Sequence, residues 1–321
     1  MNDERQQNYF EGAKQFSQDK IASIRKHFNE NLMVDNFNSA IFITGSFGRN
    51  EARKTSDLDL FFIGDSNNLK EESFLRRESF AMQNKLEFPE FDKGGKILKL
   101  HASKEIMENI GGPKDDAENF FTTRMLLLLE SQFLFNEMKY DECKKSLIEE
   151  YFRDEKGKQD FKPTFLINDI VRYWRTICLN YEYKRGEYLN NPNVRDKIGL
   201  KLKNKKLKFN RIWLCYSGII PLLGKSHWNK EEAVALFKKS PYDRLKDHCE
   251  SKGKGELFAQ AAEQYVSFLR LIHQYETNKL LEDGKNDIWA EMNGFGSTFR
   301  TKIINIIQNC SEEKDWNYLL L

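Results

Sequence analysis

The sequence predicts an α+β fold in which a small sheet with its helices is followed by a region made only of helices. Two observations lead to this prediction. Short β-rich runs occur only in the first third of the chain, at residues 40–44, 58–63 and 96–101. Gly111-Gly112-Pro113 then forms the clearest break in the chain, and no further strand is expected beyond it. We therefore expect two domains, at residues 1–112 and 113–321.

The elements of the first domain follow from local patterns in chain order. A polar stretch with spaced apolar positions predicts a helix over residues 4–28. The first strand ends at Gly45, the second ends at Gly64, and the third follows the turn at Gly94-Gly95. Between the second and third strands, the charged residues 69–85 are expected to be helical.

Helices account for the second domain. Asp115 or Asp116 is expected to cap a helix that reaches about Asn136, because a short side-chain acceptor satisfies the free amides at a helix start. Further helices are expected at residues 140–152, 164–185, 205–220, 229–239, 255–281 and 285–309.

The composition limits the possible classes of function. The chain carries 51 Lys and Arg against 49 Asp and Glu, so a globally basic nucleic-acid-binding protein is not expected. The longest apolar run, Met125–Leu129, is far shorter than the ~20 residues that span a bilayer, and the N-terminus resembles neither a signal nor a transit peptide. Five scattered cysteines without C-x-x-C spacing argue against a disulfide framework and a zinc knuckle. We expect a cytoplasmic protein with reduced thiols and no membrane contact.

The first turn and the second strand contain the residues best suited to chemistry. Gly45 lets the backbone turn tightly beside a ligand, the amides that follow can point at phosphate oxygens, and Ser46 adds a hydroxyl donor. Asp57 and Asp59 are two residues apart on the expected strand, so both carboxylates project from one face, and Leu58 and Leu60 face a core. Two like charges on one face repel unless a cation lies between them, and such hard oxygen ligands suit magnesium.

The string Gly-Ser-Phe-Gly-Arg-Asn-Glu at 45–51, followed by Ser-Asp-Leu-Asp-Leu at 56–60, resembles the signature of the nucleotidyltransferase superfamily that includes DNA polymerase β. The fuller string looks most like the PII uridylyltransferase branch and its small bacterial relatives. The resemblance covers about residues 38–112 and extends more loosely through 115–131 and 168–182. It implies a small mixed-sheet catalytic head and a helical domain that closes over the nucleotide.

This resemblance implies a magnesium-dependent enzyme that moves an NMP group from an NTP, such as ATP, to a hydroxyl acceptor and releases pyrophosphate. Gly45, Ser46 and Arg49 would bind the nucleotide, and Asp57 and Asp59 would hold two magnesium ions. The acceptor stays open between a protein, tRNA, a small molecule and a second nucleotide. The alternative is a catalytically degenerate protein on the same fold that senses nucleotides or binds a partner.

The family usually supplies a third carboxylate from a later strand, and this chain departs from that pattern. The expected third strand offers Lys99 and His101 on one face and no acid, while Glu90 and Asp92 lie just before it. Either Asp92 or Glu90 takes the role from a loop, or His101 acts as the base, or the enzyme is degenerate.

Arg124 lies among apolar residues of the helix after the break. An arginine in that position either pairs with an acid, with Glu130 as one candidate, or contacts a phosphate.

A later helix has two faces. Apolar residues make one stripe, at Ile167, Ile170, Trp174, Ile177, Cys178 and Tyr181. Arg172 and Arg175 lie opposite, beside Asp169. They are either a solvated face or a clamp for the triphosphate, and the resemblance favours the clamp.

The stretch from Arg195 to Arg211 carries eight basic residues and one acid. No aromatic residues share a face with these charges, so a solvated basic segment is the main expectation. Contact with phosphate or tRNA is the alternative.

Overall fold

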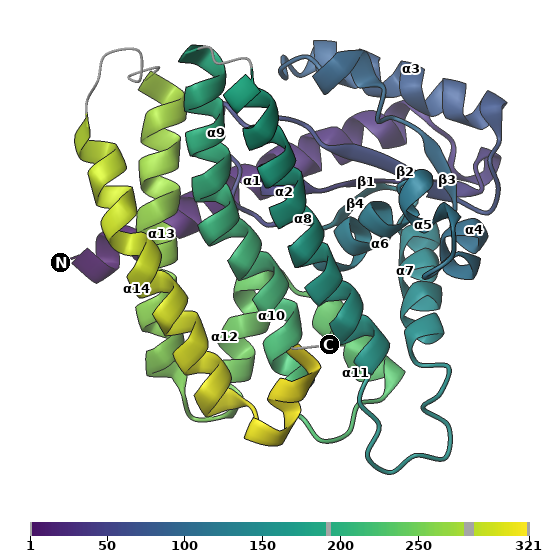
Figure 1. The fold of residues 1–321 in the computed structure, drawn as a ribbon. Coiled ribbons are helices and arrows are strands. Elements are labelled where there is room, and N and C mark those ends of the chain that lie inside the picture. The colour runs from purple at the N-terminus through teal and green to yellow at the C-terminus, as the bar shows by residue number, and fades with distance from the viewer. Residues whose placement is uncertain (1, 191–193, 279–285, 320–321) are drawn as a thin grey trace. The chain divides into compact units, whose positions relative to one another are not determined.

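The computed structural model describes residues 2–190, 194–278 and 286–319 (Figure 1). The chain divides into two compact units. The sheet unit comprises Phe10–Lys156 and Asn229–Ser240, and the helical unit comprises Met1–Tyr9, Gly157–Trp228 and Pro241–Leu321. A small sheet near the N-terminus followed by many helices confirms the α+β fold class.

The sheet has four strands in the order β3-β2-β1-β4. Their bounds are Ser39–Ile43 for β1, Leu60–Gly64 for β2, Leu100–Ala102 for β3 and Gln132–Phe135 for β4. β1 pairs antiparallel with both β2 and β4, whereas β3 runs parallel to β2. The sheet is therefore mixed, as expected.

Helices flank this sheet and connect its strands. They are α1 (Asn2–Asn31), α2 (Gly45–Gly48), α3 (Leu69–Lys85), α4 (Ser103–Glu108), α5 (Lys114–Ala117), α6 (Phe120–Leu129), α7 (Glu137–Tyr151) and α11 (Lys230–Lys238). Short 3₁₀ turns occur at Val34–Asn36 and Asp92–Gly95. The side chain of Asn68 begins α3 by accepting hydrogen bonds from the amides of Lys70 and Glu71, which a helix start leaves free.

Both faces of the sheet are covered by apolar side chains. On one face, Ile41 and Leu60 join a buried cluster that includes Phe28 of α1 and Leu75 of α3. On the other face, the ring of Phe42 lies 5.5 Å from that of Phe61 and 6.2 Å from that of Tyr140 on α7. Each fully buried side chain of this size contributes about 1.5–3 kcal/mol.

Two expectations for residues 113–136 were wrong. The single helix predicted to reach Asn136 is divided into α5 and α6, because Asn119 adopts a left-handed backbone with φ 59°. The chain then forms β4, although no strand was expected after the break at residue 112. β4 is only four residues long and is stabilised by pairing with β1, far away in the sequence, so local patterns do not show it.

Two boundaries also differ from the prediction. The third strand is shorter than 96–101, because a turn in which the amide of Leu98 donates to the carbonyl of Gly95 precedes β3. The sheet unit continues past residue 112 to Lys156, since β4 and α7 complete the sheet and one of its layers.

The remaining helices form the helical unit. They are α8 (Thr164–Asn190), α9 (Val194–Lys206), α10 (Ile212–Leu223), α12 (Pro241–Ser251), α13 (Gly255–Asn278) and α14 (Asn286–Cys310), with a π-helical turn at Leu207–Arg211 and a 3₁₀ segment at Glu313–Leu319. α13 and α14 lie side by side (Figure 1). Stacked aromatic rings fill the core of this unit, with Trp213 4.6 Å from Tyr265 and Phe209 4.2 Å from Phe268.

Candidate functional site

The tight turn after β1 depends on glycine. Gly45 has φ 68°, a backbone conformation that residues with a Cβ rarely adopt. A Cβ at this position would lie 2.5 Å from Oδ2 of Asp59, so a larger residue would collide with the carboxylate. Ser46 follows in α2 and is half-buried. The structure therefore places the Gly-Ser turn directly beside one of the two expected metal ligands.

Backbone pairing holds the aspartates at this turn. The amide of Thr44 donates to the carbonyl of Asp59 at 2.9 Å, although β2 itself begins one residue later, at Leu60. Leu58 and Leu60 are buried in the core, whereas Asp57 is exposed and Asp59 is half-buried. The aspartates thus precede the strand instead of lying within it, and the alternation between a polar and a packed face is as expected.

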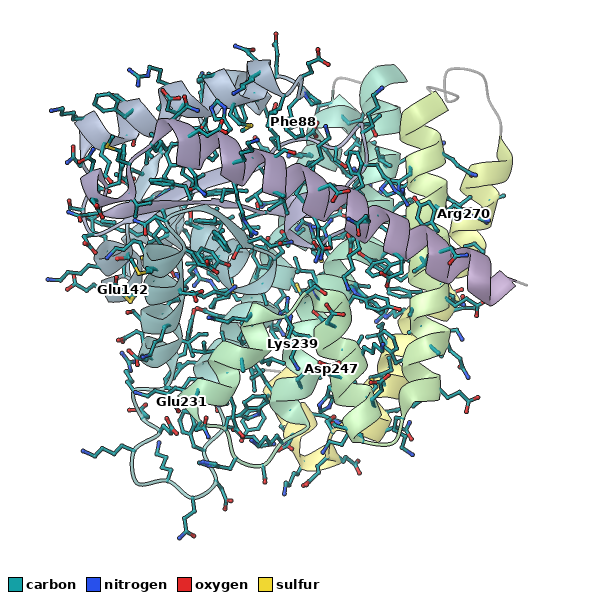
Figure 2. All side chains as sticks on the ribbon, turned by 180° about the vertical axis from the view of Figure 1, so that it is seen from behind. Phe88, Glu142, Glu231, Lys239, Asp247 and Arg270 are labelled. Atoms are coloured by element: carbon teal, nitrogen blue, oxygen red, sulfur yellow. The ribbon has the colours of Figure 1, made fainter. Side chains whose placement is uncertain are left out.

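Two serine hydroxyl groups form hydrogen bonds with the backbone of the loop between the Gly45 turn and Asp57. Ser17 of α1 accepts a hydrogen bond from the amide of Ala52 at 2.9 Å, and Ser56 accepts one from the amide of Arg53 at 3.0 Å. Phe88, which Figure 2 labels beside α1, packs edge-on against Phe47 of α2 at 5.9 Å. These contacts fix the loop from several sides, so the turn and the carboxylates keep a defined separation.

The donor set fits magnesium. Asp57 and Asp59 offer carboxylate oxygens, and Gly45 leaves the space beside Asp59 that a Cβ would fill. Magnesium commonly takes one or two carboxylates and completes its shell with water and phosphate oxygens. In the described part of the chain, no three His, Cys, Asp or Glu side chains are grouped so that they could hold a metal. Neither Asp92 nor Glu90 therefore joins the aspartate pair as a third ligand in this structure.

His101 lies on β3, opposite Ile63 of β2, and its ring packs edge-on against Phe120 at 6.3 Å. Burial, and then the charge of Lys99, lower the pKa of the His101 imidazole below its usual value of 6.5. The ring is therefore neutral at pH 7, which is the form that can accept a proton. Asp92 begins the 3₁₀ turn before β3 and is exposed.

Arg49, expected to contact the nucleotide, is buried. Its Nε donates to Glu51 at 2.7 Å, and Nη1 donates to Glu130. A guanidinium held between two buried carboxylates favours a structural role in the turn over a contact with phosphate.

The sequence analysis missed Gln132. Its Nε2 lies 3.1 Å from the carbonyl of Phe47, 3.2 Å from that of Gly48 and 2.9 Å from Oδ1 of Asn50. No local pattern points to this contact, because it requires β4. The backbone of Asn50 is left-handed, with φ 62°. The only sign of this conformation in the sequence is the residue type, because asparagine adopts it more often than most residues.

Arg124 pairs with an acid, Asp115, which the sequence analysis had not named as its partner. The guanidinium is fully buried; it binds both carboxylate oxygens of Asp115 and donates from Nε to the hydroxyl of Tyr151 at 2.8 Å. Asp115 also accepts a hydrogen bond from the amide of Gly111 at 3.1 Å, so it stabilises the backbone at the Gly-Gly-Pro break. The expectation that Asp115 caps a helix was wrong. This arrangement favours the ion pair over the phosphate contact.

Arg172 and Arg175 lie on α8, in the helical unit. Nη1 of Arg172 is 3.7 Å from Oδ1 of Asp169, and Arg175 is exposed. On the expected apolar face of this helix, Ile167 and Ile170 are buried. The triphosphate clamp that the two arginines would form stays a prediction.

The basic stretch 195–211 is helical, since it lies in α9 and the π-helical turn. Lys205 is buried, and burial together with the charge of Lys208 lowers its pKa. Lys201, Lys206 and Lys208 are exposed. The exposure of these lysines does not decide between a solvated segment and a contact with phosphate or tRNA, so both stay predictions.

The fold and the site together combine a small mixed sheet with a glycine turn beside the carboxylate of Asp59. Residues 21–111 match the sequence profile of the nucleotidyltransferase domain, and this segment contains the turn and both aspartates. It is a nucleotidyltransferase domain, which confirms the superfamily that the motif resembles. No curated protein matches the chain.

A domain of this family supports nucleotidyl transfer in general, with an NTP as substrate. Among the described residues, no helix is both long enough and apolar enough to cross a membrane.

Proposed function

We propose that this protein transfers an NMP group from a magnesium-bound NTP to a hydroxyl acceptor and releases pyrophosphate. The observation that supports the proposal is the close approach of Asp59 Oδ2 to Gly45, so that a glycine turn lies beside a carboxylate inside the segment that matches the nucleotidyltransferase domain. The likeness of residues 45–60 to the PII uridylyltransferase branch, and a cytoplasmic location, belong to the same proposal.

Each residue has a defined part in this proposal. Gly45 and Ser46 hold the β- and γ-phosphates, and Asp57 and Asp59 hold the two metal ions. Magnesium, when bound, neutralises charge on the triphosphate and lowers the pKa of the acceptor hydroxyl. The acceptor oxygen forms a bond to the α-phosphorus, the bond from that phosphorus to the pyrophosphate oxygen breaks, and the hydroxyl proton leaves to a base.

Two groups are proposed for that base. His101 is half-buried, and its lowered pKa keeps it neutral and able to accept a proton at pH 7. Asp92 is the second candidate, from the turn before β3. Arg172 and Arg175 would steady the charge of the leaving pyrophosphate.

A second candidate function is nucleotide binding without transfer. The observation that favours it is the lack, among the described residues, of a three-ligand acidic group around Asp57 and Asp59. Two carboxylates and a phosphate turn are sufficient to bind a magnesium nucleotide, whereas transfer also needs a base.

Label transfer tests the proposal. The protein is incubated with magnesium and each α-labelled NTP in turn, with and without a cell lysate, beside the variants Asp57→Asn and Asp59→Asn. Both variants should lose transfer and keep the far-UV circular dichroism of the wild type, because asparagine has the size of aspartate and neither side chain is fully buried. Magnesium-dependent transfer in both variants would overturn the metal assignment.

Thermal unfolding with and without nucleotide separates the two candidate functions. A melting temperature that rises with NTP plus magnesium, through binding to the native state, but without any label transfer, selects the binding function. If the protein shows neither label transfer nor a shift in melting temperature, both candidate functions are refuted.

A further inference from the structure

β4 contains a bulge that determines which side chain reaches the catalytic turn. Ile41 pairs with Phe135 and Phe42 pairs with Phe133, so the register shifts by one residue between them. As a consequence Gln132, and not Phe133, lies opposite Ile43. A shift of one residue moves each following side chain to the other face of a strand, so the bulge decides that a polar amide lies at the end of β1.

The amide of Gln132 meets three acceptors that all belong to the turn. Phe47 and Gly48 provide the carbonyls with which α2 ends, at 3.1 and 3.2 Å, and Asn50 provides Oδ1 at 2.9 Å. α2 has only four residues, and a helix of one turn is not stable without tertiary contacts. The left-handed backbone at Asn50 adds a conformation that its surroundings must hold in place.

The loop between α6 and β4 supplies a second attachment to the same turn. Glu130 accepts a hydrogen bond from Arg49, and a Cβ on Gly48 would lie 1.8 Å from the carbonyl oxygen of Glu130. The backbone of the turn is thus packed directly against residues 130–132, which lie beyond the segment 21–111 that matches the family.

We propose that Gln132 is a positioning residue that holds the turn 45–50 in the shape that binds the triphosphate. This inference rests on the proposed function, because it assigns the turn to phosphate binding. Gln132 acts through the backbone of Phe47 and Gly48 and touches no reacting atom. The nucleotide site of this chain is therefore completed by a strand that lies outside its family segment.

Two measurements on the full chain test the inference. Hydrogen exchange reports the turn itself, since the amides of Gly48, Arg49, Asn50 and Glu51 donate to carbonyls of residues 44–47. Isothermal titration with magnesium and ATP, or the NTP that the labelling experiment selects, reports the site. The variant is Gln132→Met, which keeps the length of the side chain and removes the donor.

Ser131→Ala is the matched control. Ser131 is the neighbouring residue, and its hydroxyl donates to the carbonyl of Leu127 and contacts the hydroxyl of Tyr140, away from the turn. Asn50→Gly is a second variant, because glycine keeps the left-handed backbone and removes only one acceptor.

Gln132→Met should raise the exchange rates of residues 48–51 and the nucleotide dissociation constant by about tenfold, since a lost hydrogen bond shifts such equilibria by that order. Asn50→Gly should produce a smaller change of the same sign. Ser131→Ala should lower the melting temperature and leave both measurements unchanged.

The outcomes separate this inference from the proposed function. Unchanged exchange at residues 48–51 in Gln132→Met and Asn50→Gly overturns the inference, whatever the nucleotide affinity. Unchanged affinity, in a wild type that binds, also overturns it. A wild type that binds no nucleotide refutes the proposed function, while the exchange rates still decide whether Gln132 shapes the turn.

Discussion

His27 of α1 is a titratable group in the core of the sheet unit, with 5% of its surface exposed. Its Nε2 lies 3.9 Å from Oε2 of Glu78 on α3, beyond hydrogen-bond distance. Burial, and then Lys85, lower the pKa of the ring, while Glu78 and Glu30 oppose them. His27 is therefore neutral in the folded protein at pH 7.

The lowered pKa makes stability depend on pH. As the pH falls through 6.5, the unfolded chain takes up a proton at His27 that the folded chain does not, so the free energy of unfolding decreases. His27→Leu should reduce this decrease, although His101 and His248, whose pKa values are also lowered, keep part of it. Urea unfolding at pH 7.5 and pH 5.5 measures the difference for each protein. An equal pH dependence in wild type and variant would contradict the prediction.

Residue types in the sequence were informative where a side chain acts locally. The Gly-Ser turn and the Asp-Leu-Asp string could be recognised because their spacing is local, and the structure brings Gly45 and Asp59 into contact. The partners of Arg49 and Arg124 could not be chosen from the sequence. Glu130 was the one candidate named for Arg124, and the ion pair with Asp115 depends on the packing of α5 against α6.

At the scale of elements, two helical glycines have opposite surroundings. Gly48 ends α2 so close to Glu130 that an added Cβ would lie 1.8 Å from a backbone oxygen. Gly186 lies within α8, and nothing comes within 4 Å of the place where its Cβ would be. The first glycine is required by packing, whereas the second only makes its helix less stable.

Alanine at these two positions should therefore have effects of opposite sign. Gly48→Ala should lower the free energy of unfolding by about 2–3 kcal/mol, because backbone atoms must move. Gly186→Ala should raise the stability of α8 by about 0.5–1 kcal/mol, because alanine loses less conformational freedom in a helix. Chemical denaturation followed by circular dichroism measures both. The prediction fails if Gly48→Ala is as stable as the wild type.

Elements with a clear local pattern were predictable, and a short strand defined mainly by its pairing was not. The expected helix at 69–85 matches α3, and the strand at 40–44 matches β1 within one residue, because their patterns are local. β4 could not be predicted, since four residues carry little periodicity. Its partner strand, β1, lies far before it in the sequence. The same absence of local signal hid Gln132.

At the scale of the whole molecule, nucleotide binding tests whether the helical unit contributes to the site. Nη1 of Arg172 lies 3.7 Å from Oδ1 of Asp169 on α8, and both side chains are half-buried. Arg185 pairs with Glu182 at 2.9 Å on the same helix and provides a matched control.

Arg172→Ala should raise the NTP dissociation constant roughly ten- to a hundredfold, because a charge-assisted contact to phosphate is worth about 1.5–3 kcal/mol. Arg172→Lys should recover only part of the loss, since lysine lacks the planar fork. Arg185→Ala should leave the affinity unchanged. Titration of the Arg172 and Arg175 variants with NTP and magnesium decides, and unchanged affinity in both removes these arginines from the site.

The sheet unit is not one continuous stretch of sequence, because α11 returns to it after the chain has entered the helical unit. Lys230 and Lys238 of α11 bind Glu149 and Asp141 of α7. When the ribosome has translated Lys156, α11, which packs on α7, has not yet been synthesised. At about 5–20 residues per second, Ser240 follows on the order of ten seconds later. The first segment of the sheet unit therefore stays without the α11 contacts to α7 while much of the helical unit is translated.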